Sequence, residues 1–177
     1  AKMVGAPKFW SKGLTGKGQY VAVLDTGVDS RHPFLSGKVV SKLEACFSHT
    51  ECQNGKLSAV GPGAGKPSSS HGNPVDHGTH VSGIIAGKNK KFRGISPDAK
   101  IVAVNVFSWV REVKGYRAFT SDIHAGIEYA LSLKIDKGIN IAAINMSLGG
   151  GFYSSPCENV NPYTKIYNEY AKRALAN

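Results

Sequence analysis

Three short segments of the chain carry side chains of the kinds that hydrolytic enzymes use. Asp25 follows an apolar run, His77 opens a His-Gly-Thr-His segment, and Ser147 begins a Ser-Leu-Gly-Gly run. A neutral imidazole can take a proton from a hydroxyl that attacks a carbonyl, and a carboxylate can hold the second ring nitrogen as a donor. Each segment alone also has a structural explanation, as a turn aspartate, a hydrogen-bonded core histidine and a loop serine.

The elements that would position these side chains alternate along the sequence. Small apolar residues at helical spacing predict a buried helix over 78–86. A second helix is expected from about Ser121, with Ser121 or Thr120 as its N-cap, and a third over 164–176. Apolar, β-branched runs predict buried strands at 19–24, 99–107 and 139–147. This alternation indicates an α/β fold with a doubly wound, mostly parallel sheet.

Length and composition limit the class of protein. The chain has 177 residues, of which 41% are hydrophobic, which suits one domain with a core. Its formal net charge is +10, but the basic residues are scattered apart from a run at 88–93. We interpret that run as a solvated loop, so no nucleic-acid partner is expected. No apolar run approaches the roughly 18 residues of a membrane span.

The segment 48–74 is rich in Gly, Pro, Ser and Asn, which predicts a long surface insertion. Cys46 and Cys52 lie close enough for a small disulfide loop but could equally be free thiols, and Cys157 is left over. The cysteine spacing fits no zinc site. Residues 61–66 superficially resemble a nucleotide-binding loop, but no strand precedes them and a proline follows. A nucleotide-binding domain is therefore disfavoured.

Taken together and in this order, the three segments resemble the motifs of a subtilisin-like serine protease (subtilase, peptidase S8 family). The aspartate motif corresponds to 23–29, the histidine motif to 76–83 and the substrate-binding strand to 145–150. The resemblance also includes 14–18, before the first strand, and extends over essentially the whole chain. It implies a three-layer fold with helices on both faces of the sheet, incomplete in this chain, and a secreted or extracytoplasmic endopeptidase.

The resemblance assigns roles to individual residues. Asp25 would orient the imidazole and His77 would be the general base and acid, whereas His80 would have a structural role. Ser147 resembles a residue of the binding strand rather than the nucleophile. The same strand makes the Asn145-Met146-Ser147 glycosylation sequon a coincidence inside a buried element. The residues that would flank the substrate are Ser147, Leu148, Gly149 and Gly150 on one side and Arg117, Ala118 and Phe119 on the other.

The nucleophile motif of this family, Gly-Thr-Ser-Met-Ala, does not occur in the sequence. We expect residues 1–177 to form the amino-terminal portion of one catalytic domain that is inactive without its serine-bearing segment. Three explanations stay open: a nicked protease, a truncated chain, or a catalytically inactive regulatory or binding scaffold. The implied partners are polypeptide substrates, a carboxy-terminal fragment that carries the serine, and a propeptide inhibitor.

Many members of this family bind a structural Ca²⁺, and the sequence departs from that pattern. Phe34 occupies the position of an acidic ligand, and the matching loop between Lys88 and Arg93 is basic. A hard cation needs several oxygen ligands, so this site is expected to be absent, while sites elsewhere stay open. No cofactor is expected in the chain. Segments 48–74 and 108–119 border the predicted cleft, but they do not fix a cleavage specificity.

Overall fold

The computed structural model describes residues 1–68, 75–150, 154 and 163–176. Its central sheet has the strand order β3-β2-β4-β1-β7, in which β3 is antiparallel to β2 and the other neighbours are parallel. The strands of this sheet are β1 (Tyr20–Asp25), β2 (Ala45–Phe47), β3 (Ser58–Val60), β4 (Lys100–Asn105) and β7 (Ile141–Asn145). A separate hairpin consists of β5 (Phe107–Val110) and β6 (Gly115–Ala118).

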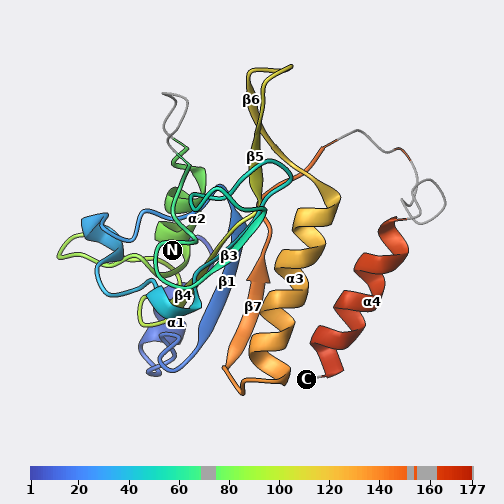
Figure 1. Ribbon diagram of the computed structural model, residues 1–177. Coiled ribbons are helices and arrows are strands. Elements are labelled where there is room, and N and C mark those ends of the chain that lie inside the picture. Colours follow the sequence, from blue (N-terminus) through green and yellow to red (C-terminus); the bar gives the residue numbers. More distant parts are fainter. Residues whose placement is uncertain (69–74, 151–153, 155–162, 177) are drawn as a thin grey trace.

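Helices cover both faces of the sheet. The helices are α1 (Ala6–Trp10), α2 (His77–Ala86), α3 (Thr120–Ile135) and α4 (Tyr163–Ala176), with short 3-10 turns η1 (Pro33–Leu35) and η2 (Ser41–Leu43). Figure 1 shows α2 on one side of the sheet and α3, with α4 outside it, on the other. The predicted α/β architecture, a mostly parallel sheet between helices, is therefore confirmed. Among the described residues, no helix is long and apolar enough to span a membrane.

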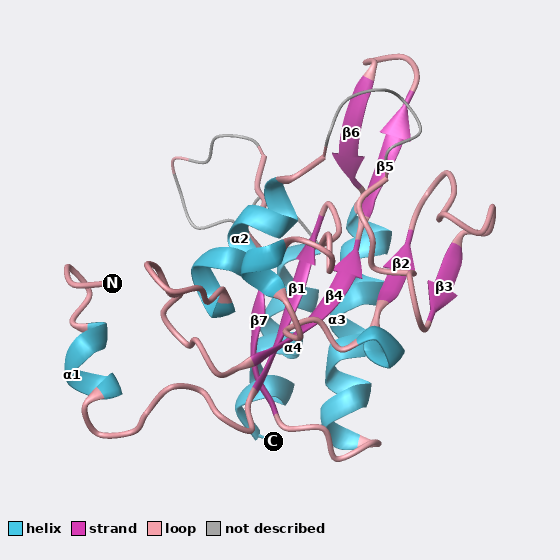
Figure 2. Cartoon of the chain, turned by 90° about the vertical axis from the view of Figure 1, so that its left-hand side faces the viewer, coloured by secondary structure: helices cyan, strands magenta, loops and turns pink. Residues whose placement is uncertain are grey.

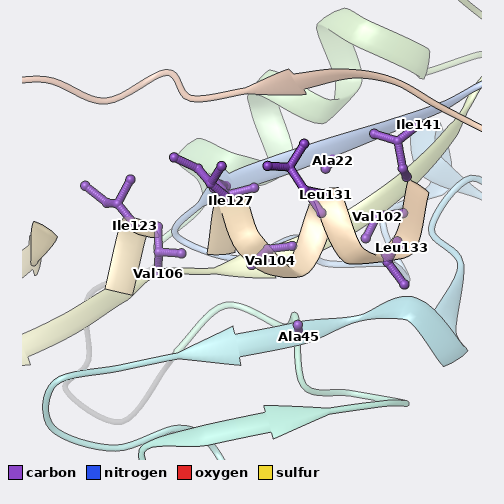
Figure 3. Close-up of a cluster of buried hydrophobic side chains, with 12 residues drawn as sticks. Ala22, Ala45, Val102, Val104, Val106, Ile123, Ile127, Leu131, Leu133 and Ile141 are labelled. Atoms are coloured by element: carbon purple, nitrogen blue, oxygen red, sulfur yellow. The ribbon is translucent and has the colours of Figure 1, made fainter. Parts of the chain in front are cut away.

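The spacing of apolar residues explains this layering. On α3, Ile123, Ile127 and Leu131 recur every four residues and pack on the sheet, together with Val102 and Val104 of β4 (Figure 3). Burying one such side chain stabilises a protein by about 1.5–3 kcal/mol. A second cluster, centred on Val23, Val81, Ile101 and Ala103, joins the other face to α2. The strands β1 and β4 alternate between the two clusters and are thereby fixed in register.

Several predicted boundaries shift. The third strand was expected to end at Ser147, but β7 ends at Asn145. Helix α3 has Phe119, rather than Ser121 or Thr120, at its N-cap, and no side chain caps it. The run 99–107 divides because the Asn105 side chain accepts a hydrogen bond from Phe107 N (3.0 Å), after which the chain leaves the sheet. The predicted insertion 48–74 also contains a sheet strand, β3.

Candidate active site

Two elements of the core bring Asp25 and His77 together. Asp25 is the last residue of β1 and is 1% exposed, whereas His77 is the first residue of α2. The Nδ1 atom of His77 lies 2.9 Å from Oδ1 and 3.0 Å from Oδ2 of Asp25. Because both neighbours of Nδ1 are carboxylate oxygens, Nδ1 must carry the proton and donate it. This leaves the Nε2 lone pair of a neutral ring available to accept a proton.

The outer part of the imidazole faces solvent. The His77 side chain is 54% exposed even though its partner carboxylate is buried. Within the described part of the chain, no hydrogen bond reaches Nε2. His80, the alternative histidine, lies one turn farther along α2 and is exposed, and it makes no hydrogen bond to Asp25. The geometry therefore distinguishes the two histidines and pairs only His77 with the carboxylate.

Close backbone contacts fix the start of α2 against the end of β1. Gly78 N donates to the Thr26 hydroxyl (3.0 Å), and Asp29 N donates to the Thr79 hydroxyl (2.9 Å). A Cβ atom on Gly78 would lie 2.3 Å from the Gly27 carbonyl oxygen and 3.1 Å from the Asp25 side chain. Only glycine permits this approach, so the glycine after His77 is a geometric requirement of the pair.

The segment 61–67 packs behind the aspartate. Val28 N donates to the Gly65 carbonyl (2.8 Å), and the Asn105 side chain donates to the Lys66 carbonyl (3.1 Å). Gly65 itself lies so close to β4 that an added Cβ would be 2.4 Å from the Ala103 carbonyl oxygen. These contacts hold the segment that superficially resembles a nucleotide-binding loop against the interior of the fold.

Glu44 is a buried acidic residue that the sequence did not single out. Its side chain is 2% exposed and accepts a hydrogen bond from Gly65 N (3.2 Å). Burial raises the pKa of the Glu44 carboxyl above its usual value, although the Gly65 and Gly63 amides and Lys66 oppose this effect. Glu44 therefore anchors the segment 61–67, and through it the loop that follows Asp25.

The residues predicted to flank the substrate lie in two segments, one after β7 and the other on β6 and at the start of α3. Residues 147–150 come directly after β7, which is parallel to β1, so they leave the sheet at the edge where Asp25 lies. Contrary to the prediction, they lie outside the strand, and Ala142 and Ala143 of β7 are exposed because β7 is an edge strand. The Asn145 side chain donates to the Ser147 hydroxyl (3.1 Å).

The other predicted wall belongs to the hairpin and to the start of α3. Arg117 and Ala118 lie on β6, opposite Ser108 and Phe107 of β5. Phe119 stacks on the His49 ring, with 4.2 Å between the ring centroids. The hairpin projects beyond the carboxyl ends of the main strands (Figure 2). The sequence analysis did not predict this hairpin, although aromatic and β-branched residues such as Phe107, Trp109 and Val110 favour a strand.

Cys46 and Cys52 form a disulfide with a Cα–Cα distance of 6.0 Å, which decides between the two alternatives for this pair. Cys157 lies outside the described residues. The loop that the disulfide closes borders a hollow of about 900 Å³, whose other wall includes Trp109 of β5 and Phe119.

The structure describes the two segments at which we predict that the calcium site is absent. A Cβ atom on Gly87 would lie 2.1 Å from the Phe34 ring, and Lys88 pairs with Asp98 at 2.9 Å. Over the described ranges, no group of three or more His, Cys, Asp or Glu side chains could hold a metal ion. The loss of the calcium site stays a prediction.

The chain is similar to known proteins in sequence and in fold. A model of the subtilase family of peptidase S8 matches residues 16–176. The chain is 34% identical over 151 residues to the major intracellular serine protease of Bacillus subtilis (strain 168), covering 84% of this chain and 40% of the relative. It is 32% identical over 149 residues to the minor extracellular protease Vpr of the same organism, covering 84% of this chain and 16% of that relative.

Two solved structures have a similar fold. The S41 psychrophilic protease superposes with a TM-score of 0.59 and 26% identity, and sphericase with a TM-score of 0.59 and 27% identity. Each match covers 90% of this chain and 44% of the other. The chain thus spans less than half the length of these relatives and structural neighbours. With its match to the family model over residues 16–176, the chain belongs to the subtilase family.

Proposed function

We propose that this chain supplies the aspartate and histidine of an Asp/His/Ser triad in a serine endopeptidase, with the nucleophilic serine on a segment outside these 177 residues. The observation that carries the proposal is the contact of 2.9 Å between His77 Nδ1 and the buried Asp25 carboxylate, with the rest of the ring exposed. A structural histidine in a core would have both nitrogens occupied or buried, whereas this ring offers Nε2 to an incoming group.

The chemistry follows from this orientation. His77 Nε2 takes the proton from the serine hydroxyl as its oxygen attacks the scissile carbonyl, and it later gives that proton to the leaving amine. Asp25 accepts the Nδ1–H hydrogen bond throughout, which fixes the tautomer and stabilises the imidazolium. Polypeptide substrates would lie between residues 147–150 and 117–119 in extended form, because extended peptides bind by adding a strand to an exposed backbone.

Two exposed surfaces could bind a further polypeptide segment near the Asp25–His77 pair. Strand β7 pairs only with β1 in the described part of the sheet, although parallel sheets are usually enclosed. On α2, Ile84 is 54% exposed, and Ile95 beside it is 39% exposed. We propose that a carboxy-terminal, serine-bearing segment covers the β7 edge and the apolar surface at Ile84 and Ile95, and that a propeptide inhibitor is a further partner.

The disulfide supports a secreted or extracytoplasmic location, because disulfides persist mainly in oxidising compartments. The names of the two relatives reported above include both an intracellular and an extracellular protease, so membership of the family does not decide the location.

The test is hydrolysis of fluorescein-labelled casein by the complete protein, together with labelling by a serine-reactive phosphonate. We expect the unmodified protein to cleave casein and to be labelled, and His77→Ala to lose both. His80→Ala is the matched control because His80 lies on the same helix without contacting Asp25, and it should keep both activities. Absence of hydrolysis and labelling in the unmodified protein would instead favour a binding scaffold.

A further inference from the structure

A buried polar cluster outside the Asp25–His77 pair joins three elements beside the hairpin. The backbone N–H of His49 donates both to the Asp122 carboxylate and to the Ser108 hydroxyl, each at 2.8 Å. The Ser108 hydroxyl also lies 2.8 Å from that of Ser48 and 3.4 Å from the carboxylate. Asp122 is 7% exposed and Ser108 1% exposed. The cluster connects the disulfide-closed loop, β5 and the first turn of α3.

Asp122 is the acidic member of this cluster, and its two carboxyl oxygens accept hydrogen bonds from neighbouring groups. It lies in the first turn of α3, where the partial positive charge of the helix terminus stabilises an anion. Its second oxygen accepts a hydrogen bond from the Ser121 hydroxyl (3.2 Å). Hydrogen bonds to a charged acceptor are stronger than neutral ones, and removing a buried acceptor leaves its donors unsatisfied. The His49 backbone is therefore held firmly to the start of α3.

His49 links this cluster to the predicted substrate wall, residues 117–119. The His49 ring stacks on Phe119, three residues before Asp122 and directly after β6. Asp122 thus fixes the backbone of His49 on one side, and the His49 ring supports Phe119 on the other. The peptide N–H groups of Asp122 and Ile123 both donate to the Phe119 carbonyl (3.0 Å each), which anchors the same residue through the backbone.

We infer that Asp122 is a positioning residue for substrate binding, which holds the wall 117–119 in place through His49 and Phe119. The inference rests on the proposed function. Asp122 contacts neither Asp25 nor His77, so its removal should loosen the wall and weaken binding while the proton-transfer pair stays intact. This predicts a change in KM that is not accompanied by an equal change in kcat.

The experiment compares Asp122→Ala with the unmodified complete protein on fluorescein-labelled casein. We expect KM to rise about tenfold, equivalent to about 1.4 kcal/mol, with kcat within about twofold. Asp122→Asn keeps one acceptor oxygen for His49 N and should restore KM to within about threefold of the unmodified value. Asp136→Ala is the matched control, since it removes an exposed aspartate with the same charge from the other end of α3.

Binding measured without catalysis separates the two proposals. In the His77→Ala background, the Kd for the same casein should also rise about tenfold on adding Asp122→Ala. Casein binding that Asp122→Ala leaves unchanged would overturn the positioning role, whatever the catalytic result. A fall in apparent kcat with KM unchanged, and no rescue by Asp122→Asn, would also overturn it, because partial unfolding lowers the active fraction without changing KM. Casein binding that depends on Asp122, without hydrolysis by the unmodified protein, would contradict only the proposed function.

Discussion

Gly78 contributes to the candidate site because it has no side chain and so allows close backbone packing. Its backbone passes so close to Gly27 and Asp25 that the first turn of α2 starts in contact with the end of β1. The imidazole of His77 can then reach the carboxylate at 2.9 Å although the two residues are 52 positions apart. The pair is therefore a property of the strand–helix packing as much as of the two side chains.

Gly78→Ala should lower both stability and activity. The added methyl carbon would lie 2.3 Å from the Gly27 carbonyl oxygen, a backbone atom that cannot rotate away, so α2 must shift and His77 with it. We expect a loss of about 2 kcal/mol in the free energy of unfolding, within the usual 1–3 kcal/mol for overpacking. Thermal unfolding and casein hydrolysis check this.

Gly126→Ala is the control for that substitution, because the three atoms nearest to its methyl group would be side-chain carbons of Leu24 and Val106, at 3.0–3.1 Å, and not backbone. Those atoms can adjust, and alanine is favoured in a helix by up to about 1 kcal/mol. If the two variants were equally stable and active, the close approach at Gly78 would not be a requirement of the site.

The segment 61–67 shows how an element without regular structure can support a site. Its Gly65 N–H donates a hydrogen bond to the buried Glu44 carboxyl group. Its carbonyl groups accept hydrogen bonds from Val28 N and from the Asn105 side chain. Burial of a carboxylate is costly unless hydrogen bonds compensate for the lost hydration. The upward shift in the pKa of Glu44 indicates that, in the folded state, desolvation outweighs the hydrogen bonds that favour the ionised form.

This shift predicts the pH dependence of Glu44→Gln. Since folding raises the pKa of Glu44 above its ordinary value of 4.5, the stability that this carboxyl contributes is fully present below that value. It is lost as pH rises through the folded-state pKa. Glutamine cannot ionise, so Glu44→Gln should gain stability relative to the unmodified protein between pH 4 and pH 8. Urea unfolding at both pH values measures this difference.

Glu51→Gln is the matched control, because it removes one exposed carboxyl from the disulfide loop by the same substitution. A Glu44→Gln variant whose relative stability fell as pH rose would contradict the assignment, because it would mean that the ionised carboxylate stabilises the fold.

Long apolar runs made the central strands and α2 predictable from the sequence, because burial on both faces leaves little choice of residue. The strands β2, β3, β5 and β6 were missed because each has only three or four residues. The place of β2 in the sheet also depends on a distant partner, since Ala45 lies opposite Val104. The Asp25–His77 pair was predictable from its motifs. Glu44 and Asp122 were not, because their burial depends on Gly65 and His49, which lie far from them in the sequence.

Taken as a unit, the described chain has helices on both faces of its sheet but leaves the outer surface of α2 and the β7 edge open. Helices α3 and α4 cover one side of the sheet, and Glu128 joins them by an ion pair to Arg173 (2.6 Å). On the other side, α2 carries exposed Ile84, and the edge of β7 is free of strand partners among the described residues. The chain also spans less than half the length of its relatives, which fits the proposal that a further segment completes the site.

The most direct measurement is the turnover of casein by the complete protein with Asp25→Asn. An asparagine of the same shape can donate its amide N–H to Nδ1, which would place the imidazole proton on Nε2 and remove the base that the serine needs. We expect kcat to fall by about 10⁴ while the fold, checked by circular dichroism, stays intact. A loss of less than tenfold would contradict the role of Asp25 as the residue that orients His77.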